Sequence, residues 1–270
     1  MRDINTLIIP DVHGRTFWIE PVMETLTQTD GKIVYLGDFH DPYKFEWDDA
    51  DVDYLQGSVD RFKQIIELKK QNPERITLLI GNHDCGYAVD ENICSSRMDR
   101  IHRRTLEDLF RQNRNLFSLA ERHTVNGKQF VFSHAGIHKE WVSRVWGEEA
   151  DDPGFDVVKE LNDAWIKDDY GIIGALGIYD YYRGWGGSNY GSPVWADIRS
   201  WIYKSPDESL GFQIVGHTQL DKEPIVLDTI ADIDLRKTFY LDNDGVLRFY
   251  ESGEEVKKTE IDRNEMMSEI

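Results

Sequence analysis

One local pattern occurs five times in this chain and constrains its fold more than any other feature. Each time, a short apolar run ends abruptly, mostly at glycine or proline, and polar side chains follow at once. The five runs are residues 4–9, 32–36, 76–80, 129–132 and 212–215. Each run is apolar on both faces, which is typical of a strand that other layers cover from two sides.

Helical patterns separate these strands. Residues 17–28, 59–70 and 103–112 place apolar side chains three and four positions apart, as Trp18 and Val22 do. Strands that alternate with helices indicate a layered α/β architecture. In such folds, ligands collect beyond the carboxyl ends of the strands, where all five polar clusters lie. We therefore expect segments far apart in the sequence to converge on one site.

The rest of the chain predicts one domain spanning residues 1–270, because it contains no repeat, low-complexity segment or linker. Two stretches resemble insertions: an acidic loop at 46–53, and a region at about 144–192 rich in tryptophan, tyrosine, glycine and aspartate. The second region either lines a substrate entrance or covers a sheet edge. Short strands are expected at 224–228, 238–242 and 246–251, and the charged tail from about 254 is expected to fray.

Charge and hydropathy exclude several classes of protein. The net charge of −19 repels phosphate backbones, so a large nucleic-acid footprint is not expected, although bound metals allow a small phosphorylated substrate. No stretch reaches the roughly 18 apolar residues of a membrane span, and the first residues lack a signal-peptide pattern, which predicts a cytoplasmic protein. Cys85 and Cys94 form neither a disulfide framework nor a zinc knuckle. Cys85 is either a small half-buried residue or a redox-sensitive thiol near the site.

The polar clusters supply carboxylate, imidazole and amide groups, which bind divalent metals. In chain order the candidate ligands are Asp11, His13, Asp38, Asn82, His134 and His217. A carboxylate between two ions can bridge them, and two ions about 3.5–4 Å apart can clamp a phosphate and activate a bridging hydroxide for attack on phosphorus. The leaving oxygen then needs a proton from a histidine beside the metals, oriented by a carboxylate.

The same residues resemble the five motifs of the calcineurin-like metallophosphoesterases, a superfamily that includes the Ser/Thr protein phosphatases and the symmetrical bis-nucleosyl tetraphosphatases. The motifs are Asp11-Val12-His13, Gly37-Asp38-Phe39-His40-Asp41, Gly81-Asn82-His83-Asp84, His134-Ala135-Gly136 and Gly216-His217-Thr218. They occur in the family's order, and the resemblance runs from Asp11 to about residue 250. It implies a four-layer α/β/β/α sandwich of two mixed sheets.

The resemblance also implies a role for each motif residue. Asp11 and His13 would bind the first metal and Asp38 would bridge the two. Asn82, His134 and His217 would bind the second. His83 would be the general acid or a transition-state donor, oriented by Asp41. Manganese, iron and zinc all suit this ligand set.

The sequence departs from the family pattern in three places. The third motif ends in Asp84, where the protein phosphatases usually have glutamate. Many members carry a second histidine in the last motif, where this chain has Gln219, so Gln219 or water would complete the first metal's shell. The protein phosphatases place an arginine after the aspartate that corresponds to Asp41, where this chain has Pro42.

Another cation is then expected to bind the phosphate. The candidates are Arg199, which we favour because it follows a tryptophan-containing segment before the last motif, and Arg183, Arg97 and Arg100. Each of these arginines has the alternative of a surface ion pair. His40, between Asp38 and Asp41, could also face the substrate.

These observations predict a metal-dependent phosphomonoesterase that acts on a phosphoprotein or a small phosphometabolite. The alternative is a phosphodiesterase or a bis-nucleosyl tetraphosphatase-type nucleotide hydrolase, because Trp185, Tyr190 and Trp195 could stack a base or simply pack. A non-catalytic binding module with the same fold is disfavoured, because neither the ligand set nor the general acid has a gap. The fold alone does not select the substrate.

Overall fold

The computed structural model describes residues 2–43, 54–89, 97–184, 186–202 and 209–260, and two β-sheets face each other in its middle. The predicted acidic loop at 46–53 and Trp185 lie outside the described residues. The first sheet has the order β11-β10-β1-β2-β3-β4, and the second β5-β6-β7-β9-β8. The first sheet's strands are β1 (Ile4–Ile9), β2 (Lys32–Tyr35), β3 (Ile76–Leu79), β4 (Phe117–Ser118), β10 (Phe239–Asp242) and β11 (Leu247–Phe249). The second sheet's strands are β5 (Ala120–Val125), β6 (Lys128–Ser133), β7 (Phe212–Val215), β8 (Ile225–Val226) and β9 (Ile230–Asp232).

Both sheets are mixed. Strands β1 to β4 run parallel, β10 pairs antiparallel with the open side of β1, and β11 pairs antiparallel with β10. In the second sheet β6, β7 and β9 run parallel, whereas β5 and β8 are antiparallel edge strands. The five strands predicted from the sequence are all present, and the parallel strands within each sheet present their carboxyl ends at a common edge.

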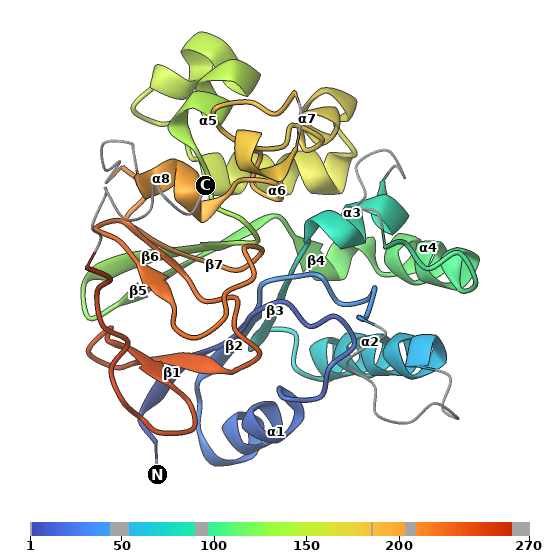
Figure 1. Cartoon of the computed structure of the whole chain (residues 1–270), viewed down its shortest axis with the longest axis vertical. Helices are drawn as coiled ribbons and strands as arrows, with labels where there is room; N and C mark the ends of the chain where they lie inside the picture. Colours follow the sequence, from blue (N-terminus) through green and yellow to red (C-terminus); the bar gives the residue numbers. More distant parts are fainter. Residues whose placement is uncertain (1, 44–53, 90–96, 185, 203–208, 261–270) are drawn as a thin grey trace.

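Helices cover the outer faces of both sheets, which gives four layers (Figure 1). On the side of the first sheet lie α1 (Ile19–Gln28) and α2 (Tyr54–Gln71), followed by α3 (Asn82–Ala88) and α4 (Arg103–Gln112). On the side of the second lie α5 (Lys139–Trp146), α6 (Val157–Lys167), α7 (Tyr170–Ala175) and α8 (Ile198–Ile202), with 3-10 turns η3 (Arg114–Leu116), η4 (Gly147–Asp151) and η5 (Tyr181–Arg183). This confirms the predicted α/β/β/α sandwich. None of the described helices is long and apolar enough to cross a membrane.

Two cores explain why the strands are apolar on both faces. In β1, Ile8 belongs to the core between the sheets, whereas Leu7 and Ile9 pack with the helices. In β6, Phe132 faces the sheet–sheet core and Val131 faces the helices. Burying one such side chain stabilises the fold by about 1.5–3 kcal/mol, so the continuous apolar runs stabilise both interfaces at once.

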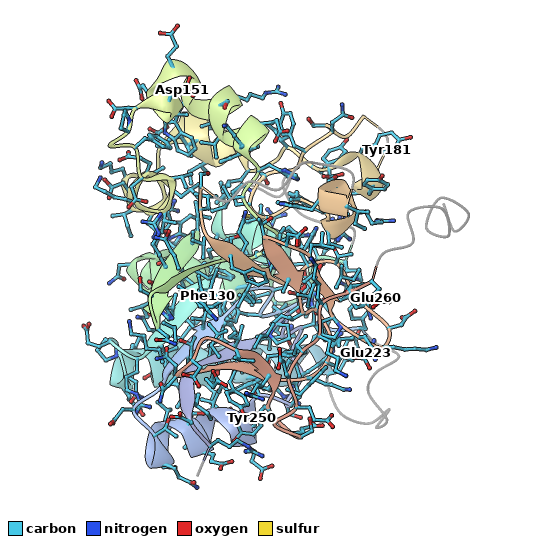
Figure 2. All side chains as sticks on the ribbon, turned by 90° about the vertical axis from the view of Figure 1, so that its left-hand side faces the viewer. Phe130, Asp151, Tyr181, Glu223, Tyr250 and Glu260 are labelled. Carbon is cyan, nitrogen blue, oxygen red and sulfur yellow. The ribbon has the colours of Figure 1, made fainter. Side chains whose placement is uncertain are left out.

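The predicted insertion is helical in its first part. It supplies η4, α6, α7 and η5, and Figure 2 shows it, marked by Asp151 and Tyr181, at the opposite end of the molecule from Tyr250. The side-chain oxygen of Asn162 in α6 accepts from the backbone N–H groups of Leu119 (2.9 Å) and Ala120 (3.2 Å). The helix therefore covers edge strand β5, as one of the two sequence readings proposed.

The prediction that the chain frays from about residue 254 is wrong for the described part of the tail. The Glu254 carbonyl accepts from Phe249 N–H (3.0 Å), and Thr259 N–H donates to the Val226 carbonyl (2.9 Å). Val256 is buried between these two contacts. The segment stays ordered because it satisfies the free edges of β11 and β8, which belong to different sheets.

Candidate metal centre

The five polar loops meet at the carboxyl ends of β1, β2, β3, β6 and β7. Hydrogen bonds join these loops within each sheet and, through the Asp11 carboxylate, between the two sheets. His13 N–H donates to the Asp38 carbonyl (2.7 Å), and His217 N–H donates to Oδ1 of Asp11 (3.1 Å). Gly216 N–H donates to the His134 carbonyl (2.8 Å). The structure thus brings the six predicted metal ligands together.

The backbone at this site is held in an uncommon conformation. Four site residues have positive φ angles, namely His13 (43°), Asp38 (51°), Asp41 (59°) and His217 (73°). Left-handed backbone costs a non-glycine residue about 1–3 kcal/mol, and it persists only where the surrounding contacts enforce it. The neighbouring glycines make room: a Cβ on Gly81 would overlap the Asp38 carboxylate. The strained backbone therefore lowers the stability of the fold, and it sets the direction of these side chains.

A buried carboxylate locks the second and third motifs together. Asp84 accepts backbone N–H bonds from Asp38 (2.7 Å), Phe39 (3.0 Å) and Gly81 (2.9 Å). Burial raises the pKa of Asp84 to about 7, against the opposing effect of these donors. The side chain of Asp84 thus fixes the loops that carry Asp38 and Asn82.

The hydrogen bonds of two histidines define where their lone pairs point. Nδ1 of His13 lies 2.9 Å from the His40 carbonyl oxygen, and Nδ1 of His134 lies 2.8 Å from that of Leu36. Because a carbonyl only accepts, both Nδ1 atoms carry the proton and both Nε2 atoms present a lone pair. Such a bond to the far nitrogen is the usual support of a metal-binding histidine.

The oxygen atoms around these lone pairs are acceptors, and Nε2 of His134 also lies 3.1 Å from Nδ1 of His217, whose role depends on its tautomer. Nε2 of His13 lies 3.6 Å from Oδ2 of Asp38 and 3.9 Å from Oδ2 of Asp11. Nε2 of His134 lies 3.0 Å from Oδ1 of Asn82 and 3.7 Å from Oδ2 of Asp38. Acceptors that converge without a hydrogen between them require a cation. The residues present therefore fit a metal centre.

Burial tunes the same groups for metal binding. Burial lowers the pKa of His13, His134 and His217, which keeps the imidazoles in the neutral form that binds metals. Nε2 of His217 is buried with no hydrogen-bond partner among the described residues. Burial, with the charge of Asp11 next, raises the pKa of Asp38.

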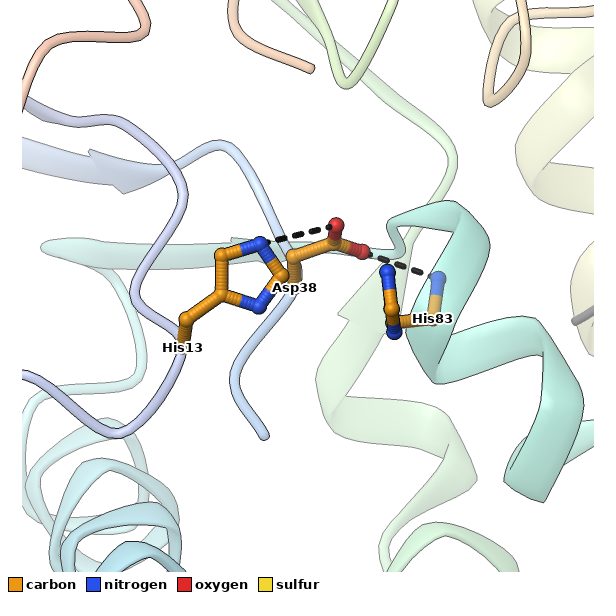
Figure 3. A group of neighbouring side chains, drawn as sticks. All are labelled: His13, Asp38 and His83. Carbon is orange, nitrogen blue, oxygen red and sulfur yellow. Dashed lines mark hydrogen bonds and ion pairs between the residues drawn. The ribbon is translucent and has the colours of Figure 1, made fainter. Parts of the chain in front are cut away.

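The imidazole and carboxylate atoms close enough to share an ion form two groups, both of which contain Asp38. One group contains His13, Asp38 and His83, and the other contains Asp38, His134 and His217; within each, the atoms lie within 4.8 Å of one another. Figure 3 shows the first group, with the Asp38 carboxylate between the two histidines. A carboxylate common to two groups is the arrangement that a bridging ligand needs.

His83 differs from the other site histidines because its ring is already occupied. Its Nδ1 lies 2.7 Å from Oδ2 of Asp41, and its Nε2 lies 3.2 Å from Nη2 of Arg97. Its backbone N–H donates to Oδ1 of Asp38 (2.9 Å), which keeps it beside the ligands. A ring nitrogen next to a guanidinium is a poor metal ligand, so the geometry agrees with the predicted place of His83 beside the metals.

Two of the four candidate arginines lie against the centre. The Arg97 guanidinium stacks 3.5 Å from the ring centroid of Tyr43 and donates to the Asp41 carbonyl (2.9 Å). Arg183 donates to the His217 carbonyl (3.2 Å) and to Oγ1 of Thr218 (2.7 Å).

The other two candidate arginines lie elsewhere. Arg199, the arginine that we favoured, binds both oxygens of Asp197 (2.8 and 2.9 Å). Asp197 also pairs with Nε of Arg183 (2.8 Å), so Arg199 lies one residue further from the ligands. Arg100 is exposed.

Two other residues were predicted to contact the substrate, and one lies in the interior while the other lies at the rim of the site. The side chain of His40 is fully buried, and its nitrogens bond Oγ of Ser58 (2.7 Å) and Oδ2 of Asp99 (3.0 Å). It therefore faces the interior rather than a substrate. Gln219 is exposed, and its Oε1 accepts from the hydroxyl of Tyr43 (3.4 Å).

Of the aromatic residues predicted to stack a base, Trp195 lies at the site and Tyr190 contacts another residue. The ring of Trp195 meets His217 edge-on, with 5.4 Å between centroids, whereas the Tyr190 hydroxyl accepts from Arg144 (3.1 Å). The later part of the insertion thus reaches the site through Arg183, and Trp195, just after the insertion, does so as well. Cys85 is completely buried behind the third motif.

Sequence reasoning missed two buried carboxylates near the centre. Asp232 ends β9 beside Val215 of β7, and Asp234 follows it. Burial raises the pKa of both, and Asp11 adds to the effect on Asp234. The signal was present, because an apolar run again ends in acidic residues, but no glycine or proline marks it.

Comparisons with known proteins agree with this geometry. Residues 4–220 match the family model of the calcineurin-like phosphoesterases. A search of curated proteins gave no match.

Several solved structures are similar at low sequence identity. A Saccharomyces cerevisiae protein serine/threonine phosphatase is 12% identical with a TM-score of 0.48, covering 90% of this chain and 74% of its own. YfcE, a phosphoesterase from E. coli, is 11% identical with a TM-score of 0.41, covering 94% and 97%. A protein described as a putative diadenosine tetraphosphatase is 12% identical with a TM-score of 0.40, covering 94% and 93%.

Proposed function

This chain belongs to the calcineurin-like phosphoesterase family and is therefore a dinuclear metal-dependent hydrolase of phosphoester bonds, and we propose that its substrate is a phosphate monoester. The substrate would be a phosphoprotein or a small phosphometabolite. The observation that carries this proposal is the pair of arginines on two sides of the centre, Arg97 at His83 and Arg183 at His217. A terminal phosphate carries about −1.5 to −2 charges near neutral pH, whereas a diester carries one. Two cations therefore favour the monoester.

We assign the metal ligands as the motifs suggest. Asp11 and His13 would hold the first ion, and Asp38 would be shared by both. The second ion would be held by Asn82, His134 and His217. Two divalent ions at such a site polarise the phosphoryl group and supply a nucleophile from water at neutral pH. The mixture of oxygen and imidazole nitrogen donors suits manganese, iron or zinc.

The remaining side chains bind the phosphate and deliver a proton. Arg97 would bind a phosphate oxygen, and its 3.2 Å distance from Nε2 of His83 then brings the leaving oxygen within reach of that nitrogen. His83 would give its proton to the leaving oxygen from Nε2, because Asp41 holds Nδ1. Since a nitrogen that accepts from Arg97 carries no proton, Arg97 would turn to the phosphate before Nε2 is protonated. Arg183 would bind the phosphate from the side of His217. Gln219, at the rim, would contact substrate or complete the first ion's shell.

A diester or dinucleotide substrate is the second candidate, and one observation favours it. Trp195 lies against His217, and the ring of Tyr179 lies 6.4 Å from that of Trp195. Tyr179 is 38% exposed, so its ring offers a surface on which a nucleobase could stack.

Initial rates on p-nitrophenyl phosphate and bis(p-nitrophenyl) phosphate test the choice. The protein is loaded with Mn²⁺, and Asp38→Asn is the control for contaminating phosphatases. A higher kcat/KM for the monoester supports the proposal, whereas a higher value for the diester replaces it with the second candidate. Metal binding without turnover of either substrate would mean a narrow substrate range or the non-catalytic module.

A further inference from the structure

A buried hydrogen-bond network lies behind Asp41 and includes two residues that none of the five motifs contains. They are Tyr87, in α3, and Asp99, in the segment before α4. Asp41 uses Oδ2 to bind His83, and its other oxygen, Oδ1, accepts from the hydroxyl of Tyr87 and from Asp99 N–H (3.1 Å). Both carboxylate oxygens of Asp41 therefore have donors.

Asp99 is itself held from several directions. Its carboxylate accepts from the backbone N–H groups of Ile101 (2.8 Å) and His102 (3.0 Å), and it bonds the rings of His40 (3.0 Å) and His102 (2.9 Å). Its backbone N–H also reaches the hydroxyl oxygen of Tyr87 (2.7 Å). The network thus fixes Asp99, and Asp99 fixes the hydroxyl that points at Asp41.

The network connects the two functional sides of the site. The carbonyl of His40 accepts from Nδ1 of the candidate ligand His13, while the ring of His40 bonds Asp99. Arg97, two residues before Asp99, reaches the Asp41 carbonyl and His83. The side chains of Asp41, Tyr87 and Asp99 are buried, so water competes little for these bonds and the surroundings strengthen them.

We propose that Tyr87 and Asp99 are positioning residues of the hydrolysis. By holding Oδ1 of Asp41, they fix the direction in which Oδ2 supports His83, and they keep Arg97 beside it. This inference rests on the proposed function, because it takes His83 to be the donor of the proton to the leaving oxygen. Neither residue contacts the reacting atoms.

A residue that acts by positioning His83 has a specific kinetic signature. A weakly basic leaving group, such as p-nitrophenolate, departs with little help from a proton donor. An alkoxide departs only when it is protonated, so it depends on the orientation of His83. A loss of orientation therefore slows the alkyl phosphate much more than the aryl phosphate, whereas a general structural defect slows both equally.

Tyr87→Phe removes the hydroxyl and keeps the ring. We expect kcat for glycerol 2-phosphate to fall about tenfold, as for other residues that support a functional group, while p-nitrophenyl phosphate loses less than about threefold. KM values and bound metal should not change. Asp99→Asn, which weakens the hold on the rings of His40 and His102, should give the same selective loss.

Tyr35→Phe is the matched control. Tyr35 lies in β2, is completely buried, and its hydroxyl has no hydrogen-bond partner among the described residues. The same chemical change in the core should leave the rates on both substrates unaltered.

Equal losses on both substrates in Tyr87→Phe, or no loss on either, would overturn the inference. His83→Ala in the same assay separates this outcome from a failure of the proposed function. If His83→Ala is selective for the alkyl phosphate and Tyr87→Phe is not, only the positioning role is wrong. If His83→Ala slows both substrates equally, the acid role falls and the inference falls with it.

Discussion

The two sides of the centre differ in how their polar atoms are satisfied. On the ligand side, lone pairs crowd together: Nε2 of His134 lies near Oδ1 of Asn82, the Asp38 carboxylate and Nδ1 of His217, and Nε2 of His217 has no partner among the described residues. On the side of His83, both oxygens of Asp41 receive donors. The polar atoms on the ligand side need a cation as their partner, whereas those on the side of His83 find their partners within the protein.

This difference separates binding from positioning. Buried acceptors that lack donors destabilise a protein, so they persist where a ligand compensates for them. A network whose acceptors all have donors is rigid and holds a side chain in one direction. Variants on the ligand side should therefore lose metal, and variants on the side of His83 should keep metal and lose rate.

The largest effect is expected from Asp38→Asn, which removes the carboxylate shared by both ligand groups. Metal content and turnover should fall together, with the rate approaching that without protein. Elemental analysis after desalting and p-nitrophenyl phosphate hydrolysis measure the two. Asp60→Asn, an exposed carboxylate in α2, is the control. Two ions retained per chain in Asp38→Asn would remove Asp38 from the bridging position.

The next effect is expected from His83→Ala. Because Nε2 of His83 is engaged by Arg97 and not by a ligand, the metals should remain while kcat for an alkyl phosphate falls about 10²- to 10⁴-fold. Elemental analysis and steady-state kinetics on glycerol 2-phosphate test this. A loss of one ion per chain would instead make His83 a metal ligand and erase the difference between the two sides.

A smaller effect is expected from the arginines. Arg97→Ala and Arg183→Ala should each raise KM for a monoester roughly ten- to a hundredfold, because each loses a charged hydrogen bond to phosphate. Arg199→Ala should raise KM less, because the Arg199 guanidinium bonds Asp197 and the Tyr182 carbonyl, whereas Arg183 also bonds the His217 carbonyl at the centre. Steady-state kinetics on p-nitrophenyl phosphate rank the three variants. A larger effect for Arg199→Ala would restore the sequence-based choice.

The smallest effect concerns stability. Burial raises the folded-state pKa of Asp232 above that of the unfolded chain, so the folded state binds more protons above about pH 4. Asp232 therefore lowers the free energy of unfolding as pH rises toward its folded pKa. Asp232→Asn should stabilise the metal-free protein increasingly with pH, by at most about 1.4 kcal/mol per pH unit.

Urea unfolding with a chelator at several pH values between 5 and 8 measures this difference, and Asp60→Asn again serves as the reference. A stability difference that does not change with pH would show that Asp232 is not held with a raised pKa. In that case, the buried acceptors without donors would be limited to the six predicted metal ligands.

Much of the fold followed from local pattern. The runs at 4–9 and 212–215 have the bounds of β1 and β7, because apolar stretches between glycine-rich loops specify buried strands. The strands expected at 238–242 and 246–251 correspond to β10 and β11, and the turn between them has Gly245 at φ 72°. The tail at 254–259 was missed because its partners, the edges of β11 and β8, exist only after both sheets have formed.

The sequence by itself determined the donor set and the end of the sheets at which it gathers, because side-chain type and strand periodicity are local properties. Only the tertiary structure decided which side chains near the motifs point into the site and which point away from it. Asp11 meets His217 across 206 positions, and Asp41 meets Asp99 across 58. Chain spacing does not encode the direction of such side chains, which packing and the pairing of buried polar atoms decide. For that reason His40 turned inward and Arg97 reached the site that Arg199 was expected to fill.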